Sequence, residues 1–204
     1  MDRQRLLLGD PQRRLLWLSD MVTTPNRGFT LIELLIGLAI FAFLAVLAGP
    51  AYFDFIGNTQ VRTAAENSLL GVRLAQQEAL RRNALARFVF TPDTGWQVDY
   101  FDDETDAFVP VQSYKFQEGA SRTTQVSTPG GATTVTFNGL GRVVRNPDLP
   151  PPIDRLDFSN TNVSESARRP LRVVISDPSA RAAIKLCDPD PGVATTDARA
   201  CPPL

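Results

Sequence analysis

A single carboxylate, Glu33, lies at the start of a long apolar stretch of the sequence. Arg27 and Gly28 precede it, and no charged residue follows between Leu34 and Phe53. A lone acid at the centre of a membrane helix costs about 2.5–3.5 kcal/mol even on lenient insertion scales, and such acids usually mark a functional site. The sequence therefore predicts that Glu33 does more than form part of a plain anchor.

Several kinds of chemistry are missing from the composition. There is no histidine among the 204 residues, so the usual general base near neutral pH and the commonest metal ligand are absent. There is also no glycine-rich phosphate loop and no nucleophile at a recognisable spacing from a base. The formal net charge of -1 provides no long-range attraction for nucleic acid. We therefore expect a protein that is not an enzyme, with no cofactor and no metal site.

The apolar stretch predicts a transmembrane helix over residues 29–53. About 20 uncharged residues at roughly 1.5 Å each match the ~30 Å thickness of a hydrocarbon core. Three alternatives are weaker. A cleavable secretory signal has only about 7–15 apolar residues, a plain signal anchor gives Glu33 no purpose, and the remaining chain is too small to enclose a core helix of this kind.

The residues before and within this stretch carry a specific resemblance. Arg27-Gly28-Phe29-Thr30-Leu31-Ile32-Glu33 resembles the class III signal of type IV pilins and type II secretion pseudopilins. The resemblance implies that a prepilin peptidase cuts between Gly28 and Phe29 and N-methylates Phe29. It also implies that Glu33 meets the free amino terminus of a neighbouring subunit in a filament. Arg27 fits the positive-inside rule, with the leader in the bacterial cytoplasm and the C-terminal part in the periplasm, anchored in the inner membrane.

The leader peptide would comprise residues 1–28, which is long for this class of signal. Translation from Met21 would leave a short leader that ends in the same Arg27-Gly28 pair. We predict that Met21 is the true start.

Helical periodicity continues after the predicted span, over residues 54–87. Apolar residues recur there every three or four positions, which predicts an amphipathic helix: Val61, Ala65, Leu69, Val72, Ala75 and Ala79. Glu78 and Arg82 have the i,i+4 spacing of an ion pair, which we expect on a solvated face, where it contributes only about 0.3–0.5 kcal/mol.

Residues 88–204 are expected to form a β-rich head. Alternating residues on both sides of Thr91-Pro92-Asp93-Thr94-Gly95 predict a hairpin. Further short strands are expected at 108–116, 133–137, 142–145, 156–158, 171–176 and 182–187, with a proline-rich connection over 146–152. A helix followed by antiparallel strands predicts an α+β fold in which a sheet covers the apolar face of the helix. The pilin resemblance implies the type IV pilin fold.

Parts of the head narrow the resemblance to the GspH/FimT family of minor pilins. Residues 64–87 are similar to that family's region between the helix and the first strand. Residues 136–142 resemble its recurring turn, and residues 171–176 with 184–187 resemble its final hairpin. The resemblance spans most of the chain after Gly28, although only the N-terminal motif is highly specific.

Cys187 and Cys201 are the only cysteines. Both lie on the exported side of the predicted span, where an oxidising compartment favours a disulfide. Closing a loop of ~15 residues would stabilise the fold by about 3 kcal/mol in the chain-entropy model and would pin the proline-rich tail. Two free thiols are the alternative. A zinc site is disfavoured because two cysteines without histidine are a poor ligand set.

Two functions of different classes follow from these observations. The first is a structural subunit, a minor pilin or pseudopilin that helps initiate or regulate assembly of a type II secretion pseudopilus or type IV pilus, and so assists protein secretion. The alternative is a DNA-binding minor pilin that acts in DNA uptake. Some members of the family bind DNA through a glycine-arginine-x-arginine motif, which here is replaced by a stretch containing Arg181 and Lys185, interleaved with acids.

Overall fold

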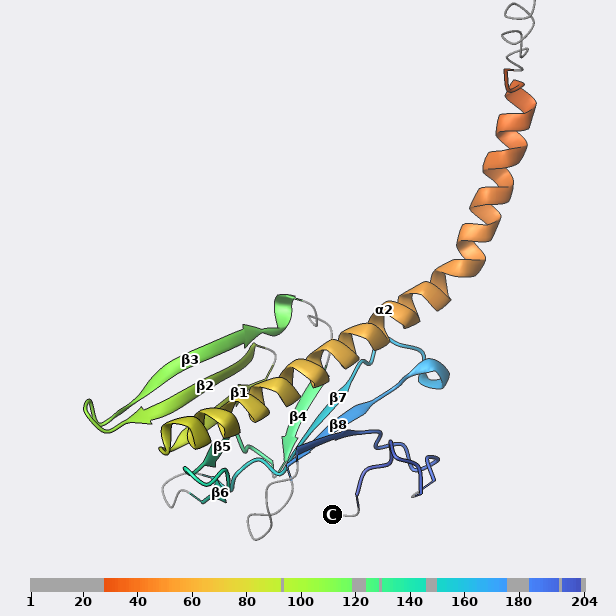
Figure 1. The fold of residues 1–204 in the computed structure, drawn as a ribbon. Coiled ribbons are helices and arrows are strands. Elements are labelled where there is room, and N and C mark those ends of the chain that lie inside the picture. Colours follow the sequence, from red (N-terminus) through yellow and green to blue (C-terminus); the bar gives the residue numbers. More distant parts are fainter. Residues whose placement is uncertain are drawn as a thin grey trace, which may run out of the picture. The chain divides into compact units, whose positions relative to one another are not determined.

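The protein is described by a computed structural model that covers residues 28–92, 94–118, 124–128, 130–145, 150–175, 184–194 and 196–202. Within these ranges one long helix, α2 (Leu31–Arg82), precedes nine strands in two sheets (Figure 1). Tertiary contacts divide the chain into two units, with the boundary between Leu47 and Ala48. We call Leu31–Leu47 the apolar segment of α2 and Gly57–Arg82 its packed segment.

Helix α2 begins where Thr30 can cap it. The hydroxyl Oγ1 of Thr30 accepts a hydrogen bond from the backbone N of Glu33 at 3.2 Å, and its carbonyl accepts one from Leu34 at 3.1 Å. The cap satisfies a backbone N–H that has no partner within the helix. It also leaves Glu33 in the first turn, where the helix dipole favours a negative charge.

Helix α2 ends at Arg82 because Asn83 takes the left-handed conformation, with φ at 50°. The backbone N of Asn83 donates to Leu80 at 3.4 Å, and that of Ala84 donates to Ala79 at 3.2 Å. This pair of bonds is the Schellman motif. The predicted helical region 54–87 therefore runs too far, since strand β1 already begins at Ala86. Asparagine tolerates the left-handed region better than most residues, and this signal was missed.

Both sheets are antiparallel throughout. The five-stranded sheet has the order β3-β2-β1-β5-β6 and the four-stranded sheet has the order β4-β7-β8-β9. The first sheet consists of β1 (Ala86–Thr91), β2 (Gly95–Asp102), β3 (Ala107–Lys115), β5 (Thr134–Phe137) and β6 (Val143–Val144). The second consists of β4 (Thr124–Thr128), β7 (Arg155–Ser159), β8 (Leu171–Ile175) and β9 (Ile184–Cys187). Two short 3-10 helices, η1 (Phe116–Glu118) and η2 (Glu165–Ala167), lie in the connections.

The predicted α+β architecture is confirmed, and each expected strand has a counterpart within two residues at either end. The predicted hairpin turn joins β1 to β2, where Thr91 pairs with Gly95. Gly95 has a φ of 148°, and a Cβ there would lie 1.8 Å from the carbonyl oxygen of Tyr114, so this position requires glycine. Strand β4 was not predicted because Val126 is the only strongly apolar residue in its sequence.

The core of the head forms where the packed segment of α2 meets aromatic side chains from the strands. The helix contributes small residues to it, including Ala65, Ala75 and Ala79, and the five-stranded sheet contributes Phe88 and Trp96. A Cβ added at Gly71 would lie 2.8 Å from both of these rings. The small residues therefore let the helix backbone approach the aromatic layer closely, at the density expected of a protein core.

Glu78 differs from its prediction. It does pair with Arg82, at 2.9 Å, and also with Arg81, at 2.6 Å. However, Glu78 is only 8% exposed, so the face is not the solvated one that we expected. The hydrogen bond from Arg81 lowers the pKa of this carboxyl against the opposing effect of burial. The guanidinium of Arg82 also lies 3.5 Å from the centre of the Tyr100 ring, so Arg82 joins the helix end to strand β2.

Candidate functional site

The predicted cleavage position lies just before α2. Gly28, Phe29 and Thr30 are outside any regular element, and Phe29 is 82% exposed. Apart from its chain neighbours, no described residue has an atom within 4 Å of the place where a side chain at Gly28 would begin.

Glu33 is the fifth residue after this bond, in the first turn of α2. Among the described residues, no basic side chain lies within ion-pair distance of its carboxylate. Its backbone N donates to the hydroxyl of Thr30, and its carboxylate accepts no hydrogen bond from another described residue. The carboxylate is therefore left available for a cation that the described part of the chain does not supply.

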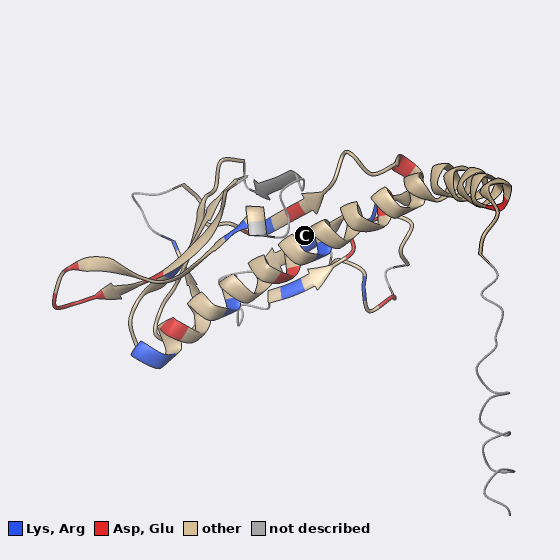
Figure 2. Ribbon diagram, turned by 90° about the horizontal axis from the view of Figure 1, so that it is seen from above, with Lys and Arg blue, Asp and Glu red and all other residues tan. Residues whose placement is uncertain are grey.

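The apolar segment that follows is exposed along its whole length. Its most apolar window has a mean hydropathy of 2.7, and none of that window is buried. By length and composition, α2 can therefore cross a membrane once. Figure 2 shows almost no charged residue along this part of the helix, and aromatic side chains follow it at Tyr52, Phe53 and Phe55.

Polar contacts tie α2 to the loop around η2 just beyond these aromatic residues. The carboxylate of Asp54 accepts hydrogen bonds from the backbone N and the hydroxyl of Ser164, at 2.9 and 2.6 Å. The side chain of Asn58 donates to the carbonyl of Ala167 at 2.8 Å and accepts from the backbone N of Arg169 at 2.9 Å. The two Ser164 bonds, chiefly the one from its hydroxyl, lower the pKa of Asp54.

The two cysteines pair as predicted. The disulfide between Cys187 and Cys201 brings their Cα atoms to 4.9 Å across a separation of 14 residues. It joins the end of β9 to the C-terminal tail. The backbone N of Asp188 donates to the carbonyl of Arg199 at 2.7 Å, so the tail returns alongside the end of the strand.

Of the two basic residues considered for DNA binding, the structure describes only Lys185. Arg181 lies outside the described residues. Lys185 is on β9, and its Nζ donates to the carbonyl of Ala200 at 3.0 Å, so it helps to hold the tail. Of the neighbouring arginines, Arg172 binds Asp157 at 2.5 Å and Arg168 donates to the carbonyl of Val163 at 3.2 Å.

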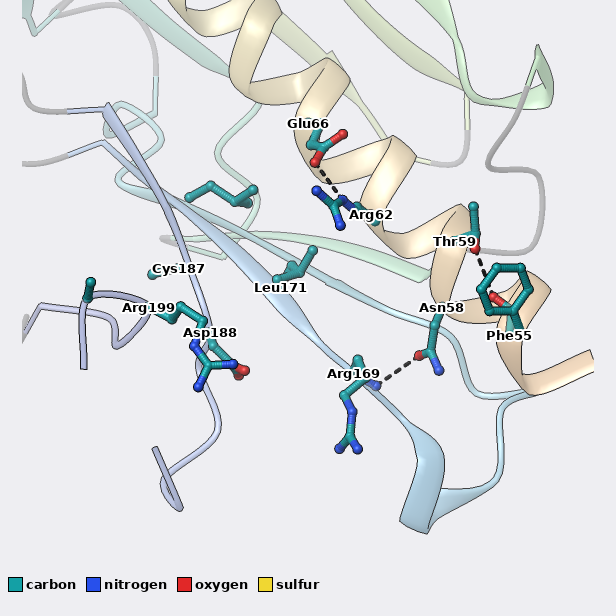
Figure 3. Close-up of a pocket in the computed structure, with 12 residues that line it drawn as sticks. Phe55, Asn58, Thr59, Arg62, Glu66, Arg169, Leu171, Cys187, Asp188 and Arg199 are labelled. Atoms are coloured by element: carbon teal, nitrogen blue, oxygen red, sulfur yellow. Dashed lines mark hydrogen bonds and ion pairs between the residues drawn. The ribbon is translucent and has the colours of Figure 1, made fainter. Parts of the chain in front are cut away.

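The head contains a groove that the sequence analysis did not predict. Its volume is about 560 Å³, and it lies between residues 55–66 of α2, strands β8 and β9, and the tail held by the disulfide (Figure 3). Its lining residues are Phe55, Asn58, Thr59, Arg62, Glu66, Arg169, Leu171, Leu186, Cys187, Asp188, Ala198 and Arg199. They come from four separate stretches of chain, so no local pattern predicts them.

The described residues contain no group of three or more Cys, Asp or Glu residues that could hold a metal ion. The acidic turn between β2 and β3 is organised internally, because Asp102 accepts hydrogen bonds from the backbone N of Glu104 and the hydroxyl of Thr105, at 3.1 and 3.2 Å. The features that remain are the exposed N-terminal segment and the groove.

Comparison with known families gives two matches. Residues 24–49 match the prokaryotic N-terminal methylation motif, and residues 64–178 match the family of the type II transport protein GspH. A fimbrial protein of Moraxella nonliquefaciens is 55% identical over 39 residues, which cover 19% of this chain and 25% of that protein. A fimbrial protein of Pseudomonas aeruginosa is 36% identical over 79 residues, which cover 34% of this chain and 51% of that protein. The matches thus span from a quarter to about half of these relatives.

Two solved structures are similar at low sequence identity. The minor pseudopilin EpsH of the Vibrio cholerae type 2 secretion system has a TM-score of 0.46 and is 12% identical, with 66% of this chain and 99% of that chain covered. The type IV minor pilin FimU of Pseudomonas aeruginosa has a TM-score of 0.44 and is 19% identical, with 65% and 91% covered.

Proposed function

The chain belongs to the family of the type II transport protein GspH and carries a prokaryotic N-terminal methylation motif, and from this we propose that it is a minor, non-enzymatic subunit of a type II secretion pseudopilus or a type IV pilus. In this role it helps initiate or regulate filament assembly, and so protein secretion. Its partners are a prepilin peptidase, other pilins or pseudopilins in a helical filament, and a membrane that it spans once.

The predicted processing and topology follow from the same motif. The peptidase cuts between Gly28 and Phe29 and methylates Phe29, and residues 29–53 hold the subunit in the inner membrane with its head in the periplasm. The exposed position of Phe29 and the exposed apolar segment support this proposal, because large apolar side chains stay out of water only if lipid or other helices cover them.

The observation that carries the proposal is the unpaired carboxylate of Glu33 next to a cleavable N-terminal bond. Cleavage creates an amino group at Phe29, four residues before an acid with no described ion-pair partner. Within an apolar helix bundle, an acid and an amine attract each other strongly only when both are present and well oriented. The pair would therefore set the axial register between neighbouring subunits.

The test is the substitution Glu33→Gln, with Glu165→Gln as the matched control on the exposed surface of η2. We expect both variants to be processed, as measured by intact mass, and to remain in the membrane fraction. Only Glu33→Gln should lose cross-linking to other filament subunits. Normal incorporation of processed Glu33→Gln into filaments would refute the registration contact.

DNA binding by the tail stays a prediction. Replacing Arg181 and Lys185 together with Gln, in a strain whose filaments still assemble, separates it from the structural role. Reduced DNA retention with normal filaments would favour DNA uptake. Unchanged retention would argue against DNA uptake and leave the structural role as the remaining proposal.

A further inference from the structure

The groove in the head lies close along the chain to the predicted membrane span. Its first lining residue, Phe55, comes two residues after the end of the span at residue 53, a separation of at most about 7 Å in any backbone conformation. Tyr52, Phe53 and Phe55 are all exposed. Aromatic residues concentrate at the interface between membrane and water. The groove therefore begins at the depth of the lipid head groups.

The loop that carries Arg169 is fixed to the same part of the helix. Asn58 bonds this loop through both the carbonyl of Ala167, at 2.8 Å, and the backbone N of Arg169, at 2.9 Å. Asn58 is only five residues beyond the predicted span, or about 7.5 Å along a helix. A residue more than 110 positions later in the sequence is thus held near the head-group region.

Three arginines and two acids line the groove. Arg62 binds Glu66 at 2.7 Å through Nε, which leaves its terminal nitrogens without a described partner. Arg199 binds Asp197, which lies outside the lining, at 2.8 Å. The hydrogen bond to Asp197 is the main cause of the raised pKa of Arg199, and the charge of Asp188 adds a smaller effect. Arg169 has no ion-pair partner among the described residues. The groove thus has unused guanidinium donors, which suit a phosphate oxygen.

The rest of the lining is mostly apolar, with Asn58 and Thr59 as its polar members. Leu171 of β8 and Leu186 of β9 lie in the wall formed by the sheet, and Phe55 belongs to α2. Figure 3 shows Arg62, Arg169 and Arg199 around the position of Leu171. The volume of about 560 Å³ lies within the range of roughly 300–1,000 Å³ that is typical of small-ligand sites. A ligand that combines an anionic group with an apolar part fits such a lining.

We propose that this groove binds the head group of an anionic phospholipid from the membrane in which the subunit is anchored. Arg169 binds the phosphate, Arg62 and Arg199 add donors, and the first part of an acyl chain lies along Leu171 and Phe55. The proposal rests on the proposed function, since only a membrane-anchored subunit holds the groove at a lipid surface. A bound lipid would fix the head against the membrane before the subunit enters a filament.

A free phosphate and an acidic peptide would meet the same arginines. The position beside the span favours lipid over free phosphate, because the membrane supplies head groups at high local concentration and the apolar walls add contacts that phosphate cannot make. An acidic segment of another protein would have to overcome Glu66 and Asp188 along its length, whereas a single phosphate can avoid them.

The test uses the full chain, purified in detergent and examined by native mass spectrometry with added dioleoyl-phosphatidylglycerol or dioleoyl-phosphatidylcholine. We expect the wild type to retain phosphatidylglycerol in preference to phosphatidylcholine. Arg169→Gln should weaken this retention about tenfold, since loss of one charge-assisted contact commonly has that effect. Arg169→Lys should keep the preference because it keeps the charge.

The matched control is Arg142→Gln, an exposed arginine outside the groove, which should not change retention. Equal retention of the two lipids, or equal loss in Arg142→Gln, would overturn the proposal. Full displacement by inorganic phosphate would identify a free-anion site instead, and cross-linking to another subunit that depends on Arg169 without any change in lipid retention would identify a peptide site. Either result overturns the lipid assignment.

Carbonate extraction of membranes from cells that express the chain separates failure of this inference from failure of the proposed function. The lipid site alone is overturned if the chain is processed and resists extraction while Arg169→Gln leaves phosphatidylglycerol retention unchanged. Unprocessed chain that carbonate extracts overturns the proposed anchoring itself.

Discussion

The two segments of α2 have opposite surroundings although they belong to one helix. The apolar segment exposes large side chains such as Leu34 and Phe41, whereas the packed segment buries Val61, Ala65 and Ala75. Large residues are thus found where no part of the described chain covers them, and small residues where the sheets approach closely. The difference shows that close packing of the helix against the sheets requires small side chains. Contact with a membrane or a filament would instead depend on the apolar area that the side chains expose.

The largest expected effect comes from placing a charge in the packed segment. Val61 is 1% exposed, so Val61→Asp buries an unpaired carboxylate and should destabilise the head by about 4 kcal/mol or more. Trp96 is the only tryptophan after Gly28, and its fluorescence during thermal unfolding of a chain that begins at Phe29 measures the change. Val46→Asp, in the apolar segment, should leave this transition unchanged and instead reduce membrane insertion. A similar loss of head stability in both variants would contradict the contrast.

A smaller effect is expected from adding one methyl group to each segment. Gly71→Ala would bring a Cβ to 2.8 Å from the Phe88 and Trp96 rings, and overpacking of this kind costs roughly 1–3 kcal/mol. Gly37→Ala meets nothing within 4 Å and should slightly favour the helix. Urea titration of both variants checks the difference. If Gly71→Ala were as stable as the wild type, the close helix approach would be wrong.

Glu78 allows a test of the electrostatics of the packed segment. Its pKa is lowered, chiefly by the Arg81 hydrogen bond, so its stabilising contribution is present above the ordinary value of 4.5 and is lost as the pH falls through the lowered pKa. Glu78→Gln should therefore cost about 1–2 kcal/mol at neutral pH. The gap from the wild type should shrink in acid, as measured by urea titration from pH 7 to about pH 3. A gap independent of pH would show that packing, not charge, is lost.

The smallest effect is expected at the exposed edge of the packed segment. Arg62 pairs with Glu66 at 2.7 Å, but both side chains are largely exposed. Arg62→Ala should therefore change the free energy of unfolding by only about 0.3–0.5 kcal/mol. If Arg62→Ala lowered the free energy of unfolding more than Glu78→Gln in the same titration, exposure would not decide which of the two ion pairs contributes more to stability.

Much of the fold could be predicted from the sequence because its signals are local. The periodicity after Phe53, the Thr91–Gly95 turn and the positions of most strands depend on neighbouring residues. The errors have local causes too: Asn83 ends the helix through a left-handed conformation, and β4 has little apolar sequence. The burial of Glu78 could not be predicted, because an i,i+4 spacing does not indicate whether a sheet covers that face.

The sequence by itself determined the order of Gly28, Phe29 and Glu33 at the start of an apolar helix, since the N-terminal methylation motif is one contiguous stretch of chain. It also determined which two cysteines could pair, because there are only two. Only the tertiary structure decided that Phe55, Arg169 and Arg199 line one groove. Packing brings Phe55 to residues more than a hundred positions later, and the disulfide between Cys187 and Cys201 holds the tail 14 positions beyond the end of β9. No local pattern specifies such contacts.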